Sequence, residues 1–472
     1  MKINCESTRE IPIPKDLFER IIGQDEAVEI AKMIPFQRRH LLLVGPPGTG
    51  KSMIAQAIAS VLPRPRYEIS VIDNPQNSER PIIEIRDENQ IKSEANKKKS
   101  FGKIVTPYEI PSFVAERFGF KCRRCGGFSS HTEFICPHCG AEKVRSGNVF
   151  ERYNQFPQIN ENGKMRIATT KRMIDGKEEL LIYERTNDGV VTRLTANELK
   201  EMETQKKRNV IVPLDRSTFV QASGNTETEL LGDIRHDPYG GHPSLGTPTY
   251  MRVVPGAVHE AHEGVLFIDE LSTLKETQRF LLTAMQEKTF PIVGHNPMSS
   301  GAVVRVDNVP CDFIFVGATN INDLKYVIPP LRSRIRGDGY EILINVYMPE
   351  NQENTNKMLQ FIAQEIEKDG RVPHADKGAI EEFLKESKRI ANSVDGVSGY
   401  TLRLRNLSGL IKMSGDVAKM EKSELIERKH VLKAIRSAKP IEDQLRDKYG
   451  NWWKTEAADY GIGKPKVGPE TA

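Results

Sequence analysis

Short apolar runs that lead to polar residues dominate the hydropathy pattern of the chain. Residues 41–44 are apolar and precede a glycine-rich turn, and residues 53–62 after this turn are rich in helix-forming side chains. Two later predicted strands, 264–268 and 312–320, lead to a pair of carboxylates and to an asparagine. Apolar runs of this length bounded by turn signals are typical of strands buried in a parallel sheet. The pattern therefore predicts an α/β fold whose strands carry polar groups at their ends.

Beyond residue 344 the strand pattern stops, and apolar residues recur at helical spacing. We interpret residues 345–448 as a separate helical lid that follows the α/β core. A C-terminal tail is expected over 449–472. The lid helices are expected over residues 358–368, 379–391, 402–420 and 424–438.

A long polar stretch separates the glycine-rich turn from the strand that leads to the carboxylates. Because both strands are expected in one sheet, the stretch 71–212 is predicted to be an insertion in a core formed by 1–70 and 213–344. Within the insertion apolar and polar residues alternate, and Asp-Gly pairs at 175 and 188 are hairpin-turn signals. The insertion is therefore expected to contain a small β-rich module.

The composition of the 472-residue chain favours a soluble protein, since 38% of its residues are hydrophobic and 28% are charged. A net charge of +4 neither favours nor excludes nucleic acid as a partner. No run approaches the roughly 18 apolar residues of a membrane span, and the first residues lack an apolar signal-peptide core. Six cysteines do not suggest a disulfide framework in so long a chain. We therefore expect a cytoplasmic protein of two to four domains with no membrane association.

The glycine-rich turn after the first strand has the sequence of a phosphate-binding loop. It matches G-x-x-x-x-G-K-[ST] at every fixed position and lies between a predicted strand and a predicted helix. Backbone N–H groups of such a loop bind phosphates, while Lys51 reaches the terminal phosphates and Ser52 binds magnesium. The sequence thus predicts a site for ATP and Mg²⁺. The residues of the loop are Gly45, Pro46, Pro47, Gly48, Thr49, Gly50, Lys51 and Ser52.

The two carboxylates, Asp269 and Glu270, supply the other half of a hydrolytic site. Asp269 suits the metal shell, and Glu270 can polarise the attacking water, which a loop that only binds phosphate would not need. Asn320 can hold that water against the γ-phosphate, although an asparagine at this position can instead cap the next turn. Ile22 and Gly23 precede an amphipathic helix and can pack on the adenine ring, the alternative being an ordinary first turn.

Two groups of arginines are candidates for stabilising phosphate charge. Arg332, Arg334 and Arg336 follow a proline pair after the asparagine strand, where a solvated basic loop is the default interpretation. Their position at the edge of the domain favours Arg334, and next Arg332, as a guanidinium that acts on the nucleotide of a neighbouring subunit. In the lid, Arg405 is expected to reach back to the γ-phosphate, in competition with Arg403 and with a plain surface helix.

Four of the six cysteines form two C-x2-C pairs that are ten residues apart, each followed by a glycine. The glycine relieves the turn of each knuckle, and four thiolates suit tetrahedral zinc at about 2.3 Å with no open coordination position. Iron–sulfur ligation and a redox C-x-x-C are the alternatives. The sequence therefore predicts a structural zinc ribbon at about 118–145. Its ligands are Cys122, Cys125, Cys136 and Cys139.

Basic and aromatic residues are interleaved around the predicted ribbon. This composition can bind nucleic acid, but in so small a domain aromatic residues more often form the core. Nucleic acid is therefore an unlikely partner by this argument, and a docking surface for a substrate or partner protein is favoured.

These motifs, in this order, resemble those of an AAA+ ATPase, and more narrowly the ATPase part of the archaeal-type Lon protease. Several matching stretches go beyond generic ATPase signatures, and together they cover roughly 1–70 and 215–448. A hairpin expected over 290–306 fits the same branch of AAA+ proteins. The stretches that carry the resemblance are 38–52, 230–238, 264–271, 281–288, 299–302, 309–313 and 331–337.

The resemblance implies a homo-hexameric ring that uses ATP to pull protein substrates through a central pore. Residues 230–239 lie where such proteins carry a pore loop, and Ile234 or Tyr239 is the candidate to grip substrate, unless the segment is a structural glycine-rich loop. Archaeal members carry transmembrane helices in the insertion and a serine–lysine protease domain after the lid. This chain has the cysteine pairs in its insertion and stops at Ala472, so we expect no membrane segment and no peptidase activity of its own.

The expected function is that of an ATP-dependent unfoldase or remodelling ATPase of a Lon-type proteolysis system, with the peptidase on a possible separate chain. The main alternative is a non-proteolytic AAA+ remodelling switch that acts on a nucleic-acid or metallo-protein complex. A nucleotide-regulated binding module with negligible turnover is a third interpretation.

Overall fold

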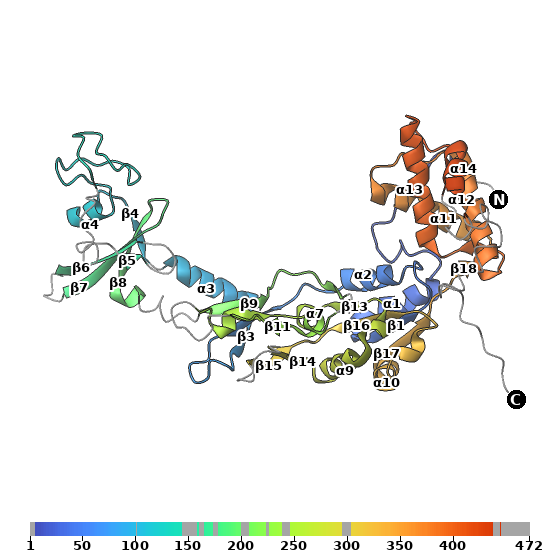
Figure 1. Cartoon of the computed structure of the whole chain (residues 1–472), viewed down its shortest axis with the longest axis horizontal. Coiled ribbons are helices and arrows are strands. Elements are labelled where there is room, and N and C mark those ends of the chain that lie inside the picture. Colours follow the sequence, from blue (N-terminus) through green and yellow to red (C-terminus); the bar gives the residue numbers. More distant parts are fainter. Residues whose placement is uncertain are drawn as a thin grey trace. The chain divides into compact units, whose positions relative to one another are not determined.

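The computed structural model describes residues 5–100, 102–143, 158–159, 165–172, 178–199, 207–222, 226–237, 246–294, 304–437 and 444. These residues form two compact units, and Figure 1 shows the elements of each. The predicted C-terminal tail, 449–472, lies outside the described residues. In the described part of the chain, no helix is long and apolar enough to cross a membrane. The first unit comprises Met1–Pro65, Asp215–His236 and Val253–Ala472, and the second comprises Arg66–Leu214 and Asp237–Arg252.

A five-stranded parallel sheet forms the centre of the first unit, with the strand order β10-β13-β16-β1-β17. Every residue of β1, β13 and β16 is buried, which accounts for their continuous apolar sequences. The predicted parallel α/β core is therefore confirmed. The strands are β1 (His40–Val44), β10 (Phe219–Ala222), β13 (Val265–Ile268), β16 (Ile314–Thr319) and β17 (Gly339–Leu343).

Helices cover both faces of this sheet, as Figure 1 shows. Leu41 and Leu43 of β1 pack in a cluster with α1 and α2, whereas Leu42 and Val44 pack in a second cluster with α8, α9 and α10. Because successive side chains of a strand point to opposite faces, one short apolar strand supports both layers. The helices are α1 (Asp25–Gln37), α2 (Lys51–Ser60), α8 (Ala257–Glu260), α9 (Gln278–Glu287) and α10 (Pro329–Asp338).

Smaller elements connect the strands of the first unit. The predicted hairpin before the asparagine strand is confirmed, because β14 and β15 pair antiparallel. β11 pairs with β12, and this contact buries Ile234 to 8% exposure, while Tyr239 lies outside the described residues. A role of either residue in gripping substrate stays a prediction. The elements are η1 (Thr8–Glu10), α7 (Glu227–Leu231), β11 (Asp233–Ile234), β12 (Val253–Val254), η3 (Leu271–Thr277), β14 (Thr289–Val293), β15 (Arg305–Pro310) and η4 (Leu324–Tyr326).

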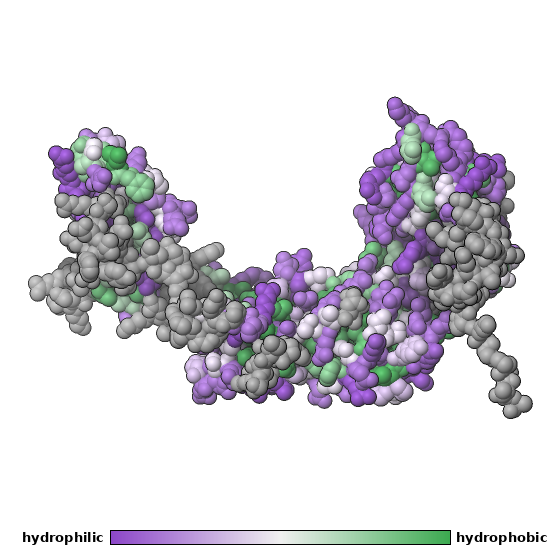
Figure 2. Space-filling view, in the orientation of Figure 1, coloured by the Kyte–Doolittle hydropathy of each residue, from purple (hydrophilic) through white to green (hydrophobic). Residues whose placement is uncertain are grey.

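The four predicted lid helices are present and share one apolar core that includes Ile362, Phe383 and Ile411. The first helix begins six residues earlier than predicted because the Asn351 side chain caps it, accepting from the N–H of Asn354 at 2.7 Å. The outer surface of these helices is mostly hydrophilic in Figure 2. The lid contains β18 (Tyr347–Met348), α11 (Gln352–Asp369), α12 (Lys377–Ile390), η5 (Ala391–Asp395), β19 (Tyr400–Thr401), α13 (Leu404–Met420) and α14 (Arg428–Ser437).

The second unit contains two antiparallel sheets, with the orders β3-β2-β9 and β4-β8-β7-β6-β5. The larger sheet packs through Ile167, Leu181 and Tyr183 against α4 and the aromatic residues of the cysteine-rich segment, so the predicted β-rich module is present. The elements are β2 (Tyr67–Ile72), β3 (Ile82–Asp87), α3 (Glu88–Ser100), β4 (Lys103–Val105), α4 (Ser112–Arg117), β5 (Gln158–Ile159), β6 (Met165–Arg172), β7 (Glu178–Arg185), β8 (Val191–Thr195), β9 (Arg208–Val212) and η2 (Thr249–Arg252).

The division into units differs from the predicted domain limits at four points, the smallest being residues 213–214, which were expected in the core and belong to the second unit. Residues 66–70, expected in the core, belong to the second unit because β2 pairs with β3 and β9. Residues 237–252 also belong to the second unit, although they lie far from the insertion in sequence. The helical lid shares the first unit with the core, whereas the sequence suggested a separate domain.

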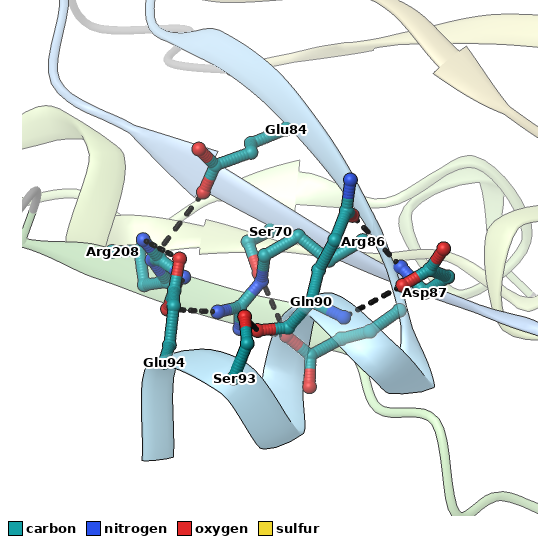
Figure 3. Close-up of polar contacts among 9 residues, drawn as sticks. Ser70, Glu84, Arg86, Asp87, Gln90, Ser93, Glu94 and Arg208 are labelled. Carbon is teal, nitrogen blue, oxygen red and sulfur yellow. Dashed lines mark hydrogen bonds and ion pairs between the residues drawn. The ribbon is translucent and has the colours of Figure 1, made fainter. Parts of the chain in front are cut away.

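Arginines and carboxylates hold α3 on the three-stranded sheet. We call this group the α3 clamp (Glu68, Glu84, Arg86, Glu94 and Arg208), and Figure 3 labels all of its members except Glu68. Arg86 donates to Glu68 on β2 and, at 2.8 Å, to Glu94 on α3. Arg208 on β9 donates to Glu94 at 2.7 Å and lies 3.3 Å from Glu84. Glu94 therefore joins α3 to two strands, β3 and β9, that lie near opposite ends of the insertion in sequence.

Candidate nucleotide site and metal centre

The phosphate-binding loop lies between β1 and α2, as the sequence predicts. Gly48 and Gly50 have φ angles of 78° and 89°, which a residue with a Cβ adopts only with strain. The N–H of Gly45 donates to the carbonyl of Thr319 at 3.0 Å, and the Thr49 hydroxyl donates to the carbonyl of Pro46 at 2.9 Å. These bonds fix the loop against β16 and place it before the N-terminus of α2, a position that favours anions.

Lys51 is 8% exposed, and its ammonium group donates to the carbonyls of Gly45 and Pro46 at 2.9 and 2.8 Å. Burial lowers the pKa of Lys51 below its ordinary value, and the nearby Asp269 opposes this shift. The lysine is therefore folded onto its own loop, where phosphate oxygens can replace the carbonyl acceptors.

One pocket brings together segments that are far apart in the sequence. Because β1, β13 and β16 are parallel neighbours, their carboxyl ends share one edge of the sheet, where ligands of such folds bind. The lid contributes to the same pocket through its third long helix. The lining residues are Pro47, Gly48, Gly50, Lys51, Ser52, Asp269, Glu270, Thr319, Asn320 and Arg405.

The acidic pair follows β13 in a constrained backbone. Glu270 has φ 54° and ψ 54°, in the left-handed region that residues other than glycine rarely adopt. Its N–H donates to the Asp269 carboxylate at 3.1 Å, and its carbonyl accepts from both the N–H and the hydroxyl of Thr273 at 2.8 Å. Such backbone conformations concentrate at functional sites, where surrounding bonds hold them.

Asn320 lies in the same pocket, at the end of β16, with its side-chain amide 3.4 Å from the Asp323 carboxylate. The preceding residue, Thr319, also lines the pocket and is only 2% exposed. Thr319 is a site residue that the sequence motifs described above do not include. A hydroxyl at the last position of an otherwise apolar strand, next to Asn320, is the signal that identifies it.

The structure distinguishes between the two lid arginines. Arg405 approaches the loop so closely that a Cβ added to Gly48 would lie 2.6 Å from the Arg405 Cβ. The Arg405 N–H also points to the Gly48 carbonyl at 3.4 Å. Arg403 instead contacts the Asp395 carboxylate at 2.7 Å. The structure thus places Arg405, and not Arg403, against the phosphate-binding loop.

Ile22 and Gly23 do not line this pocket. Ile22 is 3% exposed in the lid core, and a Cβ added to Gly23 would lie 2.6 Å from a methyl group of Leu402. The next residue, Gln24, is fixed by hydrogen bonds of 2.8 and 2.9 Å with the backbone of Asn345. The adenine contact of Ile22 and Gly23 stays a prediction.

Arg334 lies away from the nucleotide pocket of its own chain. It lines a second pocket together with His40, the first residue of β1, whereas the phosphate-binding loop follows the other end of this strand. Arg334 contacts Asp338 at 2.8 Å. An action on the nucleotide of the same subunit is therefore incompatible with this placement, and an action on a neighbouring subunit stays a prediction.

The four paired cysteines converge, with all their sulfur atoms within 4.8 Å of one another. The Sγ atoms of Cys122 and Cys139 are 3.7 Å apart, and those of Cys125 and Cys136 are 3.6 Å apart. A tetrahedron with Zn–S bonds of about 2.3 Å has edges of about 3.8 Å, so the four sulfurs fit zinc. The four cysteines therefore have the arrangement expected for the predicted zinc site.

The two knuckles have the same backbone structure. Gly126 and Gly140 have φ angles of 74° and 68°, and each donates to the carbonyl of the first cysteine of its pair at 2.9 Å. Hydrogen bonds from the N–H groups of Cys125 and Arg124 lower the pKa of the Cys122 thiol to about 6. The bond from the N–H of Gly127 lowers the pKa of the Cys125 thiol, but hydrogen bonds with the neighbouring cysteines and burial outweigh it and raise this pKa to about 11. The environment thus favours the thiolate at Cys122, one of the four that a metal ion requires.

Two family models match parts of the chain. The family model "Magnesium chelatase, subunit ChlI" matches residues 17–93, and "Sigma-54 interaction domain" matches residues 247–323. A solved structure of a Thermotoga maritima RuvB mutant aligns with 90% of this chain and 73% of its own, with a TM-score of 0.36 and 14% sequence identity.

Relatives from archaea cover almost the whole chain. A Lon protease homolog of Methanothermobacter thermautotrophicus is 50% identical over 470 residues, covering 97% of this chain and 93% of its own length. The archaeal Lon protease of Thermococcus kodakarensis is 39% identical over 471 residues, covering 99% of this chain and 65% of its own length. The chain belongs to the archaeal Lon family, whose ATPase is of the AAA+ type.

Proposed function

We propose that this chain is an ATP-dependent protein unfoldase or remodelling ATPase of a Lon-type proteolysis system, and that it acts on protein substrates as a homo-hexamer. The observation that carries the proposal is the single pocket that contains the phosphate-binding loop, both carboxylates, Asn320 and Arg405. The family relationship supports the Lon-type system.

In this proposal Lys51 exchanges its two carbonyl acceptors for the terminal phosphates of ATP. Ser52 and Asp269 line the same pocket and would hold Mg²⁺, which neutralises phosphate charge when bound. Arg405 approaches the phosphates from the lid, so that closure of the lid and the presence of the γ-phosphate favour each other.

Glu270 and Asn320 act on the attacking water. The bonds from Thr273 hold the backbone of Glu270 in its left-handed conformation, so the carboxylate is fixed beside Asp269. Glu270 polarises the water, and Asn320 orients it from the adjacent strand. Arg334 of a neighbouring subunit then stabilises the charge of the transition state.

We further propose that Cys122, Cys125, Cys136 and Cys139 hold one structural zinc ion per chain, and that the module built on them is a docking surface for a substrate or partner protein. The convergence of the four sulfurs supports the metal assignment. Metal analysis of protein prepared without chelator is expected to find one zinc per chain. Absence of zinc, or iron in its place, contradicts the assignment.

The variant Glu270→Gln tests the hydrolytic role. It is expected to bind ATP normally and to hydrolyse it at least about tenfold more slowly, because the amide cannot polarise the water. Glu276→Gln, an exposed carboxylate in the following helical segment, is the matched control and should hydrolyse ATP at the wild-type rate. Hydrolysis of ATP by Glu270→Gln at the wild-type rate would contradict the role of Glu270 in activating water.

Unfolding itself is measured as ATP-dependent loss of fluorescence from a degron-tagged folded reporter, with a trap for the unfolded product. Loss of fluorescence in the wild type and its absence in Glu270→Gln is the expected result. Cleavage fragments in the same reaction report coupling to a peptidase. Measurable ATPase activity without loss of fluorescence contradicts the unfoldase and favours a remodelling switch with a dedicated partner.

A further inference from the structure

The three arginines of α10 differ in their partners. Arg332 donates to the Glu341 carboxylate on β17 at 2.7 and 3.0 Å, and Arg336 lies 3.6 Å from the same group. Arg334 contacts Asp338, one turn further along its own helix, at 2.8 Å. The Nε of Arg334 is buried and has no hydrogen-bond partner in the described part of the chain. Arg334 is thus held by its own helix, whereas Arg332 is also tied to the sheet.

Asp338 has a second cation within reach. The Nη1 atom of Arg39 lies 3.8 Å from the Asp338 carboxylate, and Arg39 belongs to the short turn that precedes β1. Arg39 therefore stays near Asp338 when the side chain of Arg334 moves. An aspartate that loses Arg334 is not left without a positively charged neighbour.

The pocket around these side chains carries more positive than negative charge. Each of its two carboxylates lies within 4 Å of two cations. Burial, together with the nearby Arg334, lowers the pKa of His40 to about 4, so this histidine adds no charge at neutral pH. The excess of positive charge in this pocket favours movement of the Arg334 side chain toward an anion outside it. The cations are Arg38, Arg39, Lys288 and Arg334, and the carboxylates are Asp312 and Asp338.

We propose that Asp338 is a positioning residue that holds Arg334 on its own subunit, and that Arg39 takes over Asp338 when Arg334 swings to the γ-phosphate of the neighbouring subunit. This inference rests on the proposed role of Arg334 in the neighbouring nucleotide site. Competition between a half-exposed carboxylate and a phosphate makes the movement reversible, because an exposed ion pair is weak. Asp338 and Arg39 together then set the fraction of subunits whose Arg334 is engaged.

Two substitutions are expected to change ATP hydrolysis in opposite directions. Asp338→Asn removes the holding charge and should raise kcat by about two- to fivefold, the population shift expected from one exposed ion pair. Arg39→Gln leaves Asp338 with Arg334 alone and should lower kcat by a similar factor. KM for ATP should stay unchanged in both, because neither residue lines the nucleotide pocket. Opposite signs do not arise from a general loss of structure.

Three further variants separate the possible outcomes. Asp338→Glu should restore wild-type behaviour, and Asp312→Asn, which lies in the same pocket but contacts Arg38 and Lys288, should leave kcat unchanged. If Arg334→Ala hydrolyses ATP normally, the proposed role of Arg334 is wrong. If Arg334→Ala is inactive but Asp338→Asn and Arg39→Gln match the wild type, or shift in the same direction, only the holding mechanism is overturned.

Discussion

Arg86 in the second unit and Arg334 in the first both pair with carboxylates, but their surroundings differ. The Arg86 side chain is 10% exposed and contacts carboxylates from two other elements, β2 and α3. The Arg334 side chain is 38% exposed and contacts one carboxylate on its own helix. The same guanidinium–carboxylate chemistry thus forms a fixed crosslink in one place and a contact that can be exchanged in the other.

Solvent and the number of partners explain this difference. Removing one member of a buried pair leaves an uncompensated charge away from water, which costs several kcal/mol, whereas a half-exposed pair exchanges its partner for water at little cost. In the α3 clamp, Glu94 accepts from arginines of β3 and β9, so opening it breaks two pairs together. In α10, Asp338 loses Arg334 and keeps Arg39 nearby. The buried ion pairs of the α3 clamp are therefore suited to a structural role, whereas the half-exposed pair of Arg334 allows this side chain to move.

Removal of the Arg86 side chain is expected to give the largest effect and tests whether the α3 clamp is a structural crosslink. Arg86→Ala leaves Glu68, which is 8% exposed, without this partner, so the free energy of opening of the α3 region should fall by about 3 kcal/mol. Hydrogen exchange of peptides from α3 and β2 measures this opening. ATP binding should be unchanged, because the clamp and the nucleotide pocket belong to different units.

Lys92→Ala is the matched control on the same helix. Lys92 forms an exposed pair with Glu88 at 2.5 Å, with both side chains more than 60% exposed, and its removal should change the opening free energy by less than about 0.5 kcal/mol. If Arg86→Ala and Lys92→Ala have the same small effect, the clamp is not a structural crosslink and the contrast with Arg334 fails.

The strands and loops with a strong local signal were predictable from the sequence. The residues of β1, β13 and β16 are all buried because both faces of the central sheet are covered by helices. Such strands have continuous apolar sequences, which can be recognised without a structure. The phosphate-binding loop and the two cysteine knuckles are also local, because each depends on glycines at fixed offsets within a few residues.

Long-range contacts account for what the sequence did not reveal. The choice between Arg403 and Arg405 depends on how the lid meets Gly48, some 350 residues earlier in the chain. The α3 clamp joins Glu94 to Arg208, 114 residues away, and no local pattern marks that pairing. The core ends at residue 65 and not at residue 70 for the same reason, since β2 pairs with β9, which forms the far end of the insertion in sequence.

The response to acid also differs between the two regions. Among the described residues of the first unit three histidines are buried, two of them, His40 and His259, in the α/β core, whereas the α3 clamp contains none. His40 accepts from the N–H of Phe315 at 3.2 Å and His259 from that of Gly256 at 3.2 Å, through Nδ1 in each case, so each must be neutral to keep its bond. Burial lowers both pKa values to about 4 from the ordinary 6.5.

These shifts fix the sign of a pH effect on stability. Between pH 6.5 and 4 the unfolded chain binds protons at these histidines and the folded chain does not, so stability falls as the pH falls. From pH 7 to pH 5 each histidine is expected to cost about 2 kcal/mol. Protection of the central sheet against hydrogen exchange should decrease accordingly, and His40→Asn, whose amide oxygen accepts without charging, should remove the His40 share. An equal loss of protection in α3, or an unchanged pH dependence in His40→Asn, contradicts this assignment and leaves the two units alike in their response to acid.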